Sequence, residues 1–161
     1  MDKEENTRKL KLVSMDEVDI LSLDKPIIGT QALATCVGVL LYSEKHKRAI
    51  VAHVSSDYGN VLNNIIDMIF INDLIDDKIY YCIIPGFYKE HYNVVKGLTE
   101  FFEKYSDLFY PMSYDITRNC YRVDKDTNSK EFAFDSLKGI FVTNDVLFGE
   151  EYIKINNKYH K

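Results

Sequence analysis

The stretch that decides the fold is "ALATCVGVLLYSEKHKRAIVAHVSS", residues 32–56. It holds two short apolar runs, TCVGVLLY at 35–42 and AIVAHV at 49–54, and six polar residues join them. A connection this short permits only antiparallel pairing, because a parallel return needs about a dozen residues or more. The stretch therefore predicts a β-hairpin with a cysteine at the head of one strand and a histidine near the tail of the other.

The register of this hairpin decides whether the cysteine and the histidine meet. We assume that Tyr42 lies opposite Ala49. Cys36 then falls opposite Ser55, and His53 lies on the same face as Cys36, diagonal to it. Diagonal neighbours are roughly 7–8 Å apart at the backbone, which an imidazole can span. A slip of one residue would put the two side chains on opposite faces.

The remaining elements alternate between strands and helices. Apolar residues three and four apart predict helices at 61–71 and 90–104. Strands are expected at 78–86 and on either side of a polar turn at 124–129, with an extended lead-in at 18–30. Two main helices packed on a mixed, mostly antiparallel sheet make an α+β layered fold.

Length and composition indicate one soluble globular unit. The chain has 161 residues, of which 46% are hydrophobic and 28% charged. We expect a flexible N-terminal segment at 1–17, a single domain at 18–150 and a polar tail at 151–161.

Charge and cysteine usage exclude several classes of protein. The net charge of -5 and the lack of a basic stripe argue against nucleic-acid binding. No apolar run is long enough for membrane insertion, and the charged start resembles no secretory leader. Cys36, Cys82 and Cys120 show no metal-ligand spacing, so we expect no metal or other cofactor and a reducing compartment. We therefore expect a cytoplasmic protein, or one delivered to a host cell without a cleavable leader.

Cys36 and His53 allow a structural and a catalytic interpretation. Cysteine is among the most buried residue types, and a strand histidine is often a hydrogen-bonded core residue. In the catalytic interpretation, a neighbouring imidazolium lowers the pKa of the thiol, and the same histidine protonates the leaving amine. A third polar group usually orients such a histidine, and Thr30 is the candidate. Cys82 and Cys120 are expected to be structural.

The spacing of Thr30, Cys36 and His53 resembles that of the bacterial chemoreceptor glutamine deamidases (CheD). In that family a Thr stands six residues before a Cys, and a His stands 17 residues after it, as here. "LATCVGVLLY" and "AIVAHV" are similar to the two strands that carry the Cys and the His. The resemblance covers roughly residues 18–142, and it extends more distantly to deamidating toxins of the cytotoxic necrotising factor type and to N-terminal asparagine amidohydrolases.

The resemblance implies a fold, an activity and roles for residues. The fold would be an α/β/α-type sandwich around a mixed sheet. Cys36 would be the nucleophile, His53 the base and acid, and Thr30 the residue that orients His53, with the Cys36 N–H as an oxyanion donor. The reaction would deamidate Gln, or less readily Asn, in a protein substrate of bacterial or host origin. It would need no cofactor, and a regulatory protein could be a further partner.

The sequence also departs from the family pattern. The family usually has Gly-Ser or Ser-Gly before its Cys, whereas Ala34 and Thr35 stand here, and Pro85-Gly86 replaces a Gly-Gly pair. Two alternatives stay open. One is a binding module without catalysis, which would hold a protein on the aromatic residues around Pro85: Tyr80, Tyr81, Phe87, Tyr88 and Tyr92. The other is a Cys-His protease or acyl transferase.

Overall fold

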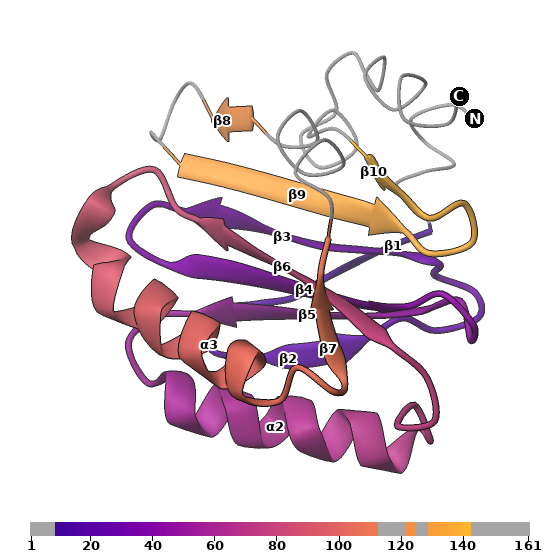
Figure 1. Cartoon of the computed structure of the whole chain (residues 1–161). Helices are drawn as coiled ribbons and strands as arrows, with labels where there is room; N and C mark the ends of the chain where they lie inside the picture. Colours follow the sequence, from indigo (N-terminus) through magenta and orange to yellow (C-terminus); the bar gives the residue numbers. More distant parts are fainter. Residues whose placement is uncertain (1–8, 113–121, 125–128, 143–161) are drawn as a thin grey trace.

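The structure is a computed structural model that describes residues 9–112, 122–124 and 129–142 (Figure 1). Its strands form two sheets. Sheet A has the order β1 (Leu10–Leu12), β3 (Ile27–Leu33), β9 (Ser129–Asp135) and β10 (Ile140–Val142), and β8 (Arg122–Asp124) also pairs with β9. Sheet B has the order β2 (Val18–Ile20), β5 (Arg48–Val54), β4 (Val37–Ser43), β6 (Ile79–Pro85) and β7 (Phe109–Pro111). The helices are α2 (Tyr58–Ile71), the short 3-10 helix η1 (Lys89–His91) and α3 (Tyr92–Lys104).

These elements stack in three layers. Figure 1 shows α2 and α3 on one face of sheet B and sheet A on the opposite face. Sheet B is therefore the middle layer, and every residue of its central strand β4 is buried. A strand that is covered on both faces reads as a continuous apolar run, which is why "VGVLLY" shows no alternation of polar and apolar residues.

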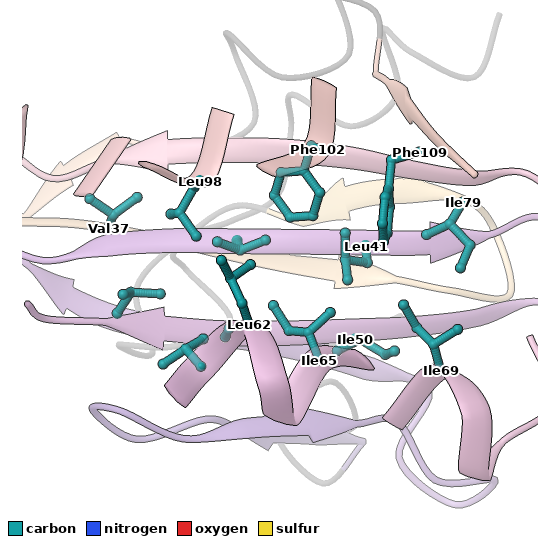
Figure 2. Close-up of a cluster of buried hydrophobic side chains, with 14 of the residues drawn as sticks. Val37, Leu41, Ile50, Leu62, Ile65, Ile69, Ile79, Leu98, Phe102 and Phe109 are labelled. Atoms are coloured by element: carbon teal, nitrogen blue, oxygen red, sulfur yellow. The ribbon is translucent and has the colours of Figure 1, made fainter. Parts of the chain in front are cut away.

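The side chains of β4 alternate between two cores. Val37, Val39 and Leu41 belong to the core between sheet B and the helices (Figure 2). Leu40 and Tyr42 belong to the core between the two sheets, here called the inter-sheet core. Successive strand residues point to opposite faces, so the residue number alone decides the layer that a β4 side chain meets.

The two helices bury one face each against sheet B. Asp57 caps α2, because its side chain accepts a hydrogen bond from the Asn60 N–H. The buried residues of α2 are Val61, Leu62, Ile65 and Ile69, and those of α3 are Val94, Leu98 and Phe102. Phe102 stacks on Tyr81 of β6 with 4.6 Å between ring centroids, so aromatic packing adds to burial here.

The predicted hairpin and its register are confirmed. Tyr42 pairs with Ala49, and the same register pairs Gly38 with His53 along β4 and β5. The predicted helices, the strand predicted at 78–86 and the strands predicted on either side of the 124–129 turn are also present, with boundaries that shift by a few residues. α3 is shorter than the predicted helix, because the first turn of that segment is the 3-10 helix η1.

The α+β layered sandwich is confirmed, and its third layer is a sheet. The α/β/α type that the resemblance implied would have helices on both faces, whereas sheet A covers the second face here. The lead-in at 18–30 forms two strands in different sheets, β2 and β3.

The N-terminal boundary of the domain also differs from the prediction. Residues 1–17 were expected to lie outside the domain, but β1 pairs in parallel with β3 inside sheet A. The predicted tail at 151–161 and Cys120 lie outside the described residues. No helix in the described part of the chain is long and apolar enough to cross a membrane.

Candidate active site

Thr30 and His53 meet across the two sheets. Thr30 lies on β3 of sheet A and His53 on β5 of sheet B, and both are buried. The Thr30 Oγ1 atom is 2.7 Å from the Val13 carbonyl oxygen and 2.7 Å from Nδ1 of His53. The site therefore depends on the contact between two sheets rather than on the hairpin alone.

The single hydroxyl proton of Thr30 fixes the tautomer of His53. The Val13 carbonyl can only accept a hydrogen bond, so the Thr30 hydroxyl donates its proton there. The second contact of Oγ1 then requires Nδ1 of His53 to be the donor. A neutral imidazole carries only one N–H, so Nε2 of His53 carries the lone pair.

Nε2 of His53 has no hydrogen-bond partner among the residues that the structure describes. The His53 side chain is only 3% exposed, so solvent does not readily satisfy this nitrogen. Leaving a buried acceptor unsatisfied costs about 1–3 kcal/mol. Such a group calls for an explanation, and a basic nitrogen held ready for a proton is one.

Cys36 lies on the same face of sheet B as His53. It immediately precedes β4 and belongs to the inter-sheet core, together with Leu40 and Tyr42. The observed ladder pairs Gly38 with His53 and ends at Val37 and Val54, one residue short of Cys36 and Ser55. Cys36 is only 5% exposed, whereas the adjacent Thr35 is exposed, so the chain passes from the surface into the core between these two residues.

The electrostatics of the pair favour two neutral groups at rest. Burial raises the pKa of the Cys36 thiol above its ordinary value, and the charge of Asp16 adds to this, while a hydrogen bond with Thr35 opposes it. Burial lowers the pKa of His53 below 6.5, although the charge of Asp16 opposes this. The sequence-based expectation of a thiol with a lowered pKa beside an imidazolium is therefore wrong for the resting protein.

The residues that follow β6 hold the backbone that precedes Cys36 by hydrogen bonds. The N–H of Phe87 donates to the Leu33 carbonyl at 3.0 Å, and the N–H of Tyr88 donates to the Ala34 carbonyl at 2.8 Å. Gly86 lies against the same loop, where a Cβ atom would come within 2.6 Å of the Ala34 oxygen. Only glycine permits this close approach, so the departure Pro85-Gly86 has a structural role beside Cys36.

Asp16 is a residue of this site that the sequence reasoning missed. It lies in the turn between β1 and β2 and accepts hydrogen bonds from Ser55, the residue that follows β5. Its φ of 62° is in the left-handed region. Asp tolerates that region better than most residues, but Met15-Asp16-Glu17 carries no motif that marks a site.

The aromatic residues around Pro85 do not form one surface. Phe87 and Tyr88 are both exposed and touch edge to face, with 5.0 Å between ring centroids. Tyr81 instead packs on Phe102 in the helix-facing core, and Tyr80 pairs with Tyr110 on β7. A binding surface beside Cys36 could therefore use only part of the predicted set.

The described residues contain no group of three or more metal-ligating side chains. Cys82, expected to be structural, is buried in the inter-sheet core, and burial raises the pKa of its thiol to about 12.

A comparison of the chain with protein-family models and with curated proteins found no match.

Proposed function

We propose that the protein is a cysteine-dependent amidohydrolase that deamidates side-chain amides, preferably Gln, in a protein substrate. The observation that carries the proposal is the hydrogen bond from His53 Nδ1 to Thr30, which leaves the buried Nε2 basic and without a partner. Cys36 lies on the same face of sheet B as His53, although it makes no hydrogen bond to this nitrogen in the resting structure. A buried nitrogen without a partner calls for an explanation, and a base that takes the thiol proton of Cys36 is the one proposed here.

The first half of the reaction acylates Cys36. Nε2 of His53 takes the thiol proton while the sulfur attacks the amide carbon, so a neutral pair acts by general-base catalysis. The resulting imidazolium gives the proton to the amide nitrogen, and ammonia leaves as the carbon–nitrogen bond breaks. The product of this half-reaction is a thioester between Cys36 and the substrate side chain.

The second half hydrolyses the thioester. His53 takes a proton from water, the hydroxide attacks the thioester carbon, and the proton returns to sulfur. A carboxylate on the substrate and a free thiol result. The backbone N–H of Cys36 is a candidate oxyanion donor, because it has no acceptor outside the strand ladders among the described residues.

A small activated ester tests the nucleophile and the base without knowledge of the substrate. Treatment with p-nitrophenyl acetate is expected to place an acetyl group on Cys36, located by peptide mass spectrometry. The rate constant should rise through the pKa of His53, below 6.5, and then stay level through neutral pH. His53→Gln should slow acylation by about 10²–10⁴-fold, the usual contribution of general-base catalysis. Cys82→Ser, which removes the other buried thiol of the inter-sheet core, is the matched control and should leave the rate unchanged.

A different pH profile would contradict the proposal. If His53 has no catalytic role, only the thiolate of Cys36 reacts. The rate would then rise about tenfold per pH unit up to the raised pKa of the thiol, equally in wild type and His53→Gln.

The amide specificity has its own test. Incubation of an unfolded carrier protein in water labelled with oxygen-18 should release ammonia and put heavy oxygen into Glu at former Gln positions. Cys36→Ser should abolish this. Chain cleavage would instead identify a protease, and incorporation of an added amine would identify an acyl transferase. If a binding module is the correct reading, the wild-type protein will show neither acylation nor ammonia release.

A further inference from the structure

Asp16 makes hydrogen bonds to His53 and to Ser55, two residues at the end of β5. Its carboxylate accepts from the Ser55 N–H at 2.9 Å and from the Ser55 hydroxyl at 2.7 Å. Its own N–H donates to the His53 carbonyl at 2.6 Å, and the N–H of His53 donates to the Glu17 carbonyl at 3.2 Å. Both peptide groups of His53 are thus held by the Asp16–Glu17 segment, next to β2 at the edge of sheet B.

The backbone of Asp16 adopts a conformation that costs free energy. A φ of 62° is uncommon for a residue with a side chain, and positions of this kind are strained. Such residues persist where the surroundings hold them, and they cluster at functional sites. Here the hydrogen bonds to Ser55 and His53 hold the strained residue in place.

The charge of Asp16 acts on both reacting groups. It favours the imidazolium form of His53 and disfavours the thiolate form of Cys36. Its own pKa is lowered, mainly by the hydrogen bonds from Ser55, so the carboxylate stays ionised at neutral pH. A carboxylate that stays ionised around neutral pH can therefore influence whether the proton is bound by Cys36 or by His53.

Other ionisable groups surround the same region. Glu17 shares the turn, and its carboxylate accepts a hydrogen bond from the Ser14 N–H. Asp57 begins α2 and lines a cavity together with Asp16. On β9, Lys130 lies opposite Leu33 of β3, and β3 contributes the uncharged Thr30 to the site. Asp16 and Glu17 both bind the backbone of His53 through their peptide groups, but the Asp16 carboxylate is the one that also accepts hydrogen bonds from Ser55.

We propose that Asp16 is a positioning residue of the Cys36–His53 site. It holds the His53 peptide groups and Ser55 in place. Its negative charge also stabilises the imidazolium form of His53 during the reaction. This inference rests on the proposed function, because it assigns Asp16 a part in the same proton transfer.

The test compares Asp16→Asn with the wild-type protein. Asn keeps an oxygen that can accept from Ser55 and tolerates a positive φ, but it removes the charge. Two measurements are made: the pKa of His53 by NMR titration, and the pH profile of Cys36 acylation by p-nitrophenyl acetate. Asp19→Asn, which removes a carboxylate from β2 that pairs with Lys11 instead, is the charge-matched control.

Removal of the charge should move both limbs of the profile in the same direction. The imidazolium loses a favourable interaction, so the pKa of His53 falls and the acidic limb of acylation shifts to lower pH. The Cys36 thiolate loses an unfavourable interaction with the carboxylate, so the pKa of the thiol falls and the alkaline limb of acylation also shifts to lower pH. Both shifts should shrink in high salt, because the carboxylate of Asp16 is exposed.

A purely structural role would slow acylation without moving these limbs. The inference is overturned if Asp16→Asn leaves the His53 titration and both limbs at their wild-type pH. Asp16→Gly, which suits the positive φ, serves if the Asn variant does not fold, and it should show the same shifts. If the wild-type protein is never acylated, the proposed function fails. An unshifted His53 titration in a folded variant overturns the role of Asp16 separately.

Discussion

At the scale of single residues, one hydroxyl proton decides what His53 can do. The Thr30 hydroxyl donates to the Val13 carbonyl and so must accept from Nδ1 of His53. The lone pair is thereby assigned to Nε2. A side chain at position 30 without a hydroxyl would remove this constraint and leave the Nδ1 proton without an acceptor.

Thr30→Val should therefore impair both stability and acylation. Val has a similar volume but leaves a buried N–H unsatisfied, which costs about 1–3 kcal/mol of unfolding free energy. The acylation rate of Cys36 should fall as the other tautomer of His53 becomes populated. Denaturant unfolding and the p-nitrophenyl acetate assay measure the two effects. Thr30→Ser keeps the hydroxyl and is the control, so an equal loss of acylation in both variants would contradict the role given to the hydroxyl.

His53 should also make the protein less stable in mild acid. Its pKa in the folded protein is below 6.5, so the unfolded chain binds the proton first. The free energy of unfolding should then decrease as the pH falls through about 6.5 and towards the pKa of the folded state. His53→Gln should flatten this part of the stability profile, measured by denaturant unfolding at several pH values. An unchanged slope would show that His53 does not titrate differently in the two states.

Only part of the site could be predicted at this scale. The spacing of Thr30, Cys36 and His53 identified three residues that share one region of the fold. The pKa directions could not be read from the sequence, because they depend on burial between two sheets. Asp16 could not be found either, since its role comes from hydrogen bonds to residues nearly forty positions away.

At the scale of elements, the backbone of the Leu33–Cys36 segment is packed against the end of β6. The N–H groups of Phe87 and Tyr88 bind two of its carbonyls, and Gly86 lies directly against the carbonyl oxygens of Leu33, Ala34 and Cys36. Ala32, near the end of β3 where the pairing with β9 shifts register, has a φ of 63°. The position of Cys36 is therefore set by β6 as well as by its own strand.

Gly86→Ala should disturb Cys36 through this contact. The new methyl group would meet the carbonyl oxygens of Leu33, Ala34 and Cys36, and backbone cannot move aside as a flexible side chain can. Overpacking of this kind typically costs about 1–3 kcal/mol, and the acylation rate of Cys36 should fall with it. Gly59→Ala is the matched control, because the nearest atom to its Cβ is 3.7 Å away. Equal acylation rates in the two variants would refute the role of Gly86.

The elements were predictable to different extents. The hairpin of β4 and β5 followed from two apolar runs and a short polar connection, which leave little choice of pairing. The segment 18–30 was harder to predict, because β2 and β3 lie close together in the sequence yet belong to different sheets. An isolated bridge from Ser22 to Lys25 turns the chain between them, and no periodicity signals that change.

At the scale of the whole molecule, the site forms where two sheets meet. Sheet A supplies Thr30 and sheet B supplies His53, and the inter-sheet core holds the two layers at hydrogen-bonding distance. This arrangement could not be predicted from local patterns. β3 pairs with β9, about a hundred residues later in the chain, and only tertiary structure brings them together.

Leu40 and Leu41 allow the two cores to be tested separately. Both are fully or almost fully buried on β4, but Leu40 faces sheet A and Leu41 faces the helices. Leu40→Ala and Leu41→Ala should each cost about 2–5 kcal/mol of unfolding free energy. At a temperature where both variants are folded, only Leu40→Ala should slow Cys36 acylation, because it loosens the packing between the sheets. Equal rates in the two variants would argue that the inter-sheet core does not control the site.

The most direct test of the central claim is the tautomer of His53 in the resting protein. Long-range proton–nitrogen NMR correlations of the imidazole ring, recorded above its pKa, report which nitrogen carries the proton. The structure predicts a proton on Nδ1 and a lone pair on Nε2, with mixed tautomers in Thr30→Val. A proton on Nε2 in the wild-type protein would contradict the account, because His53 could not then act as a base towards Cys36.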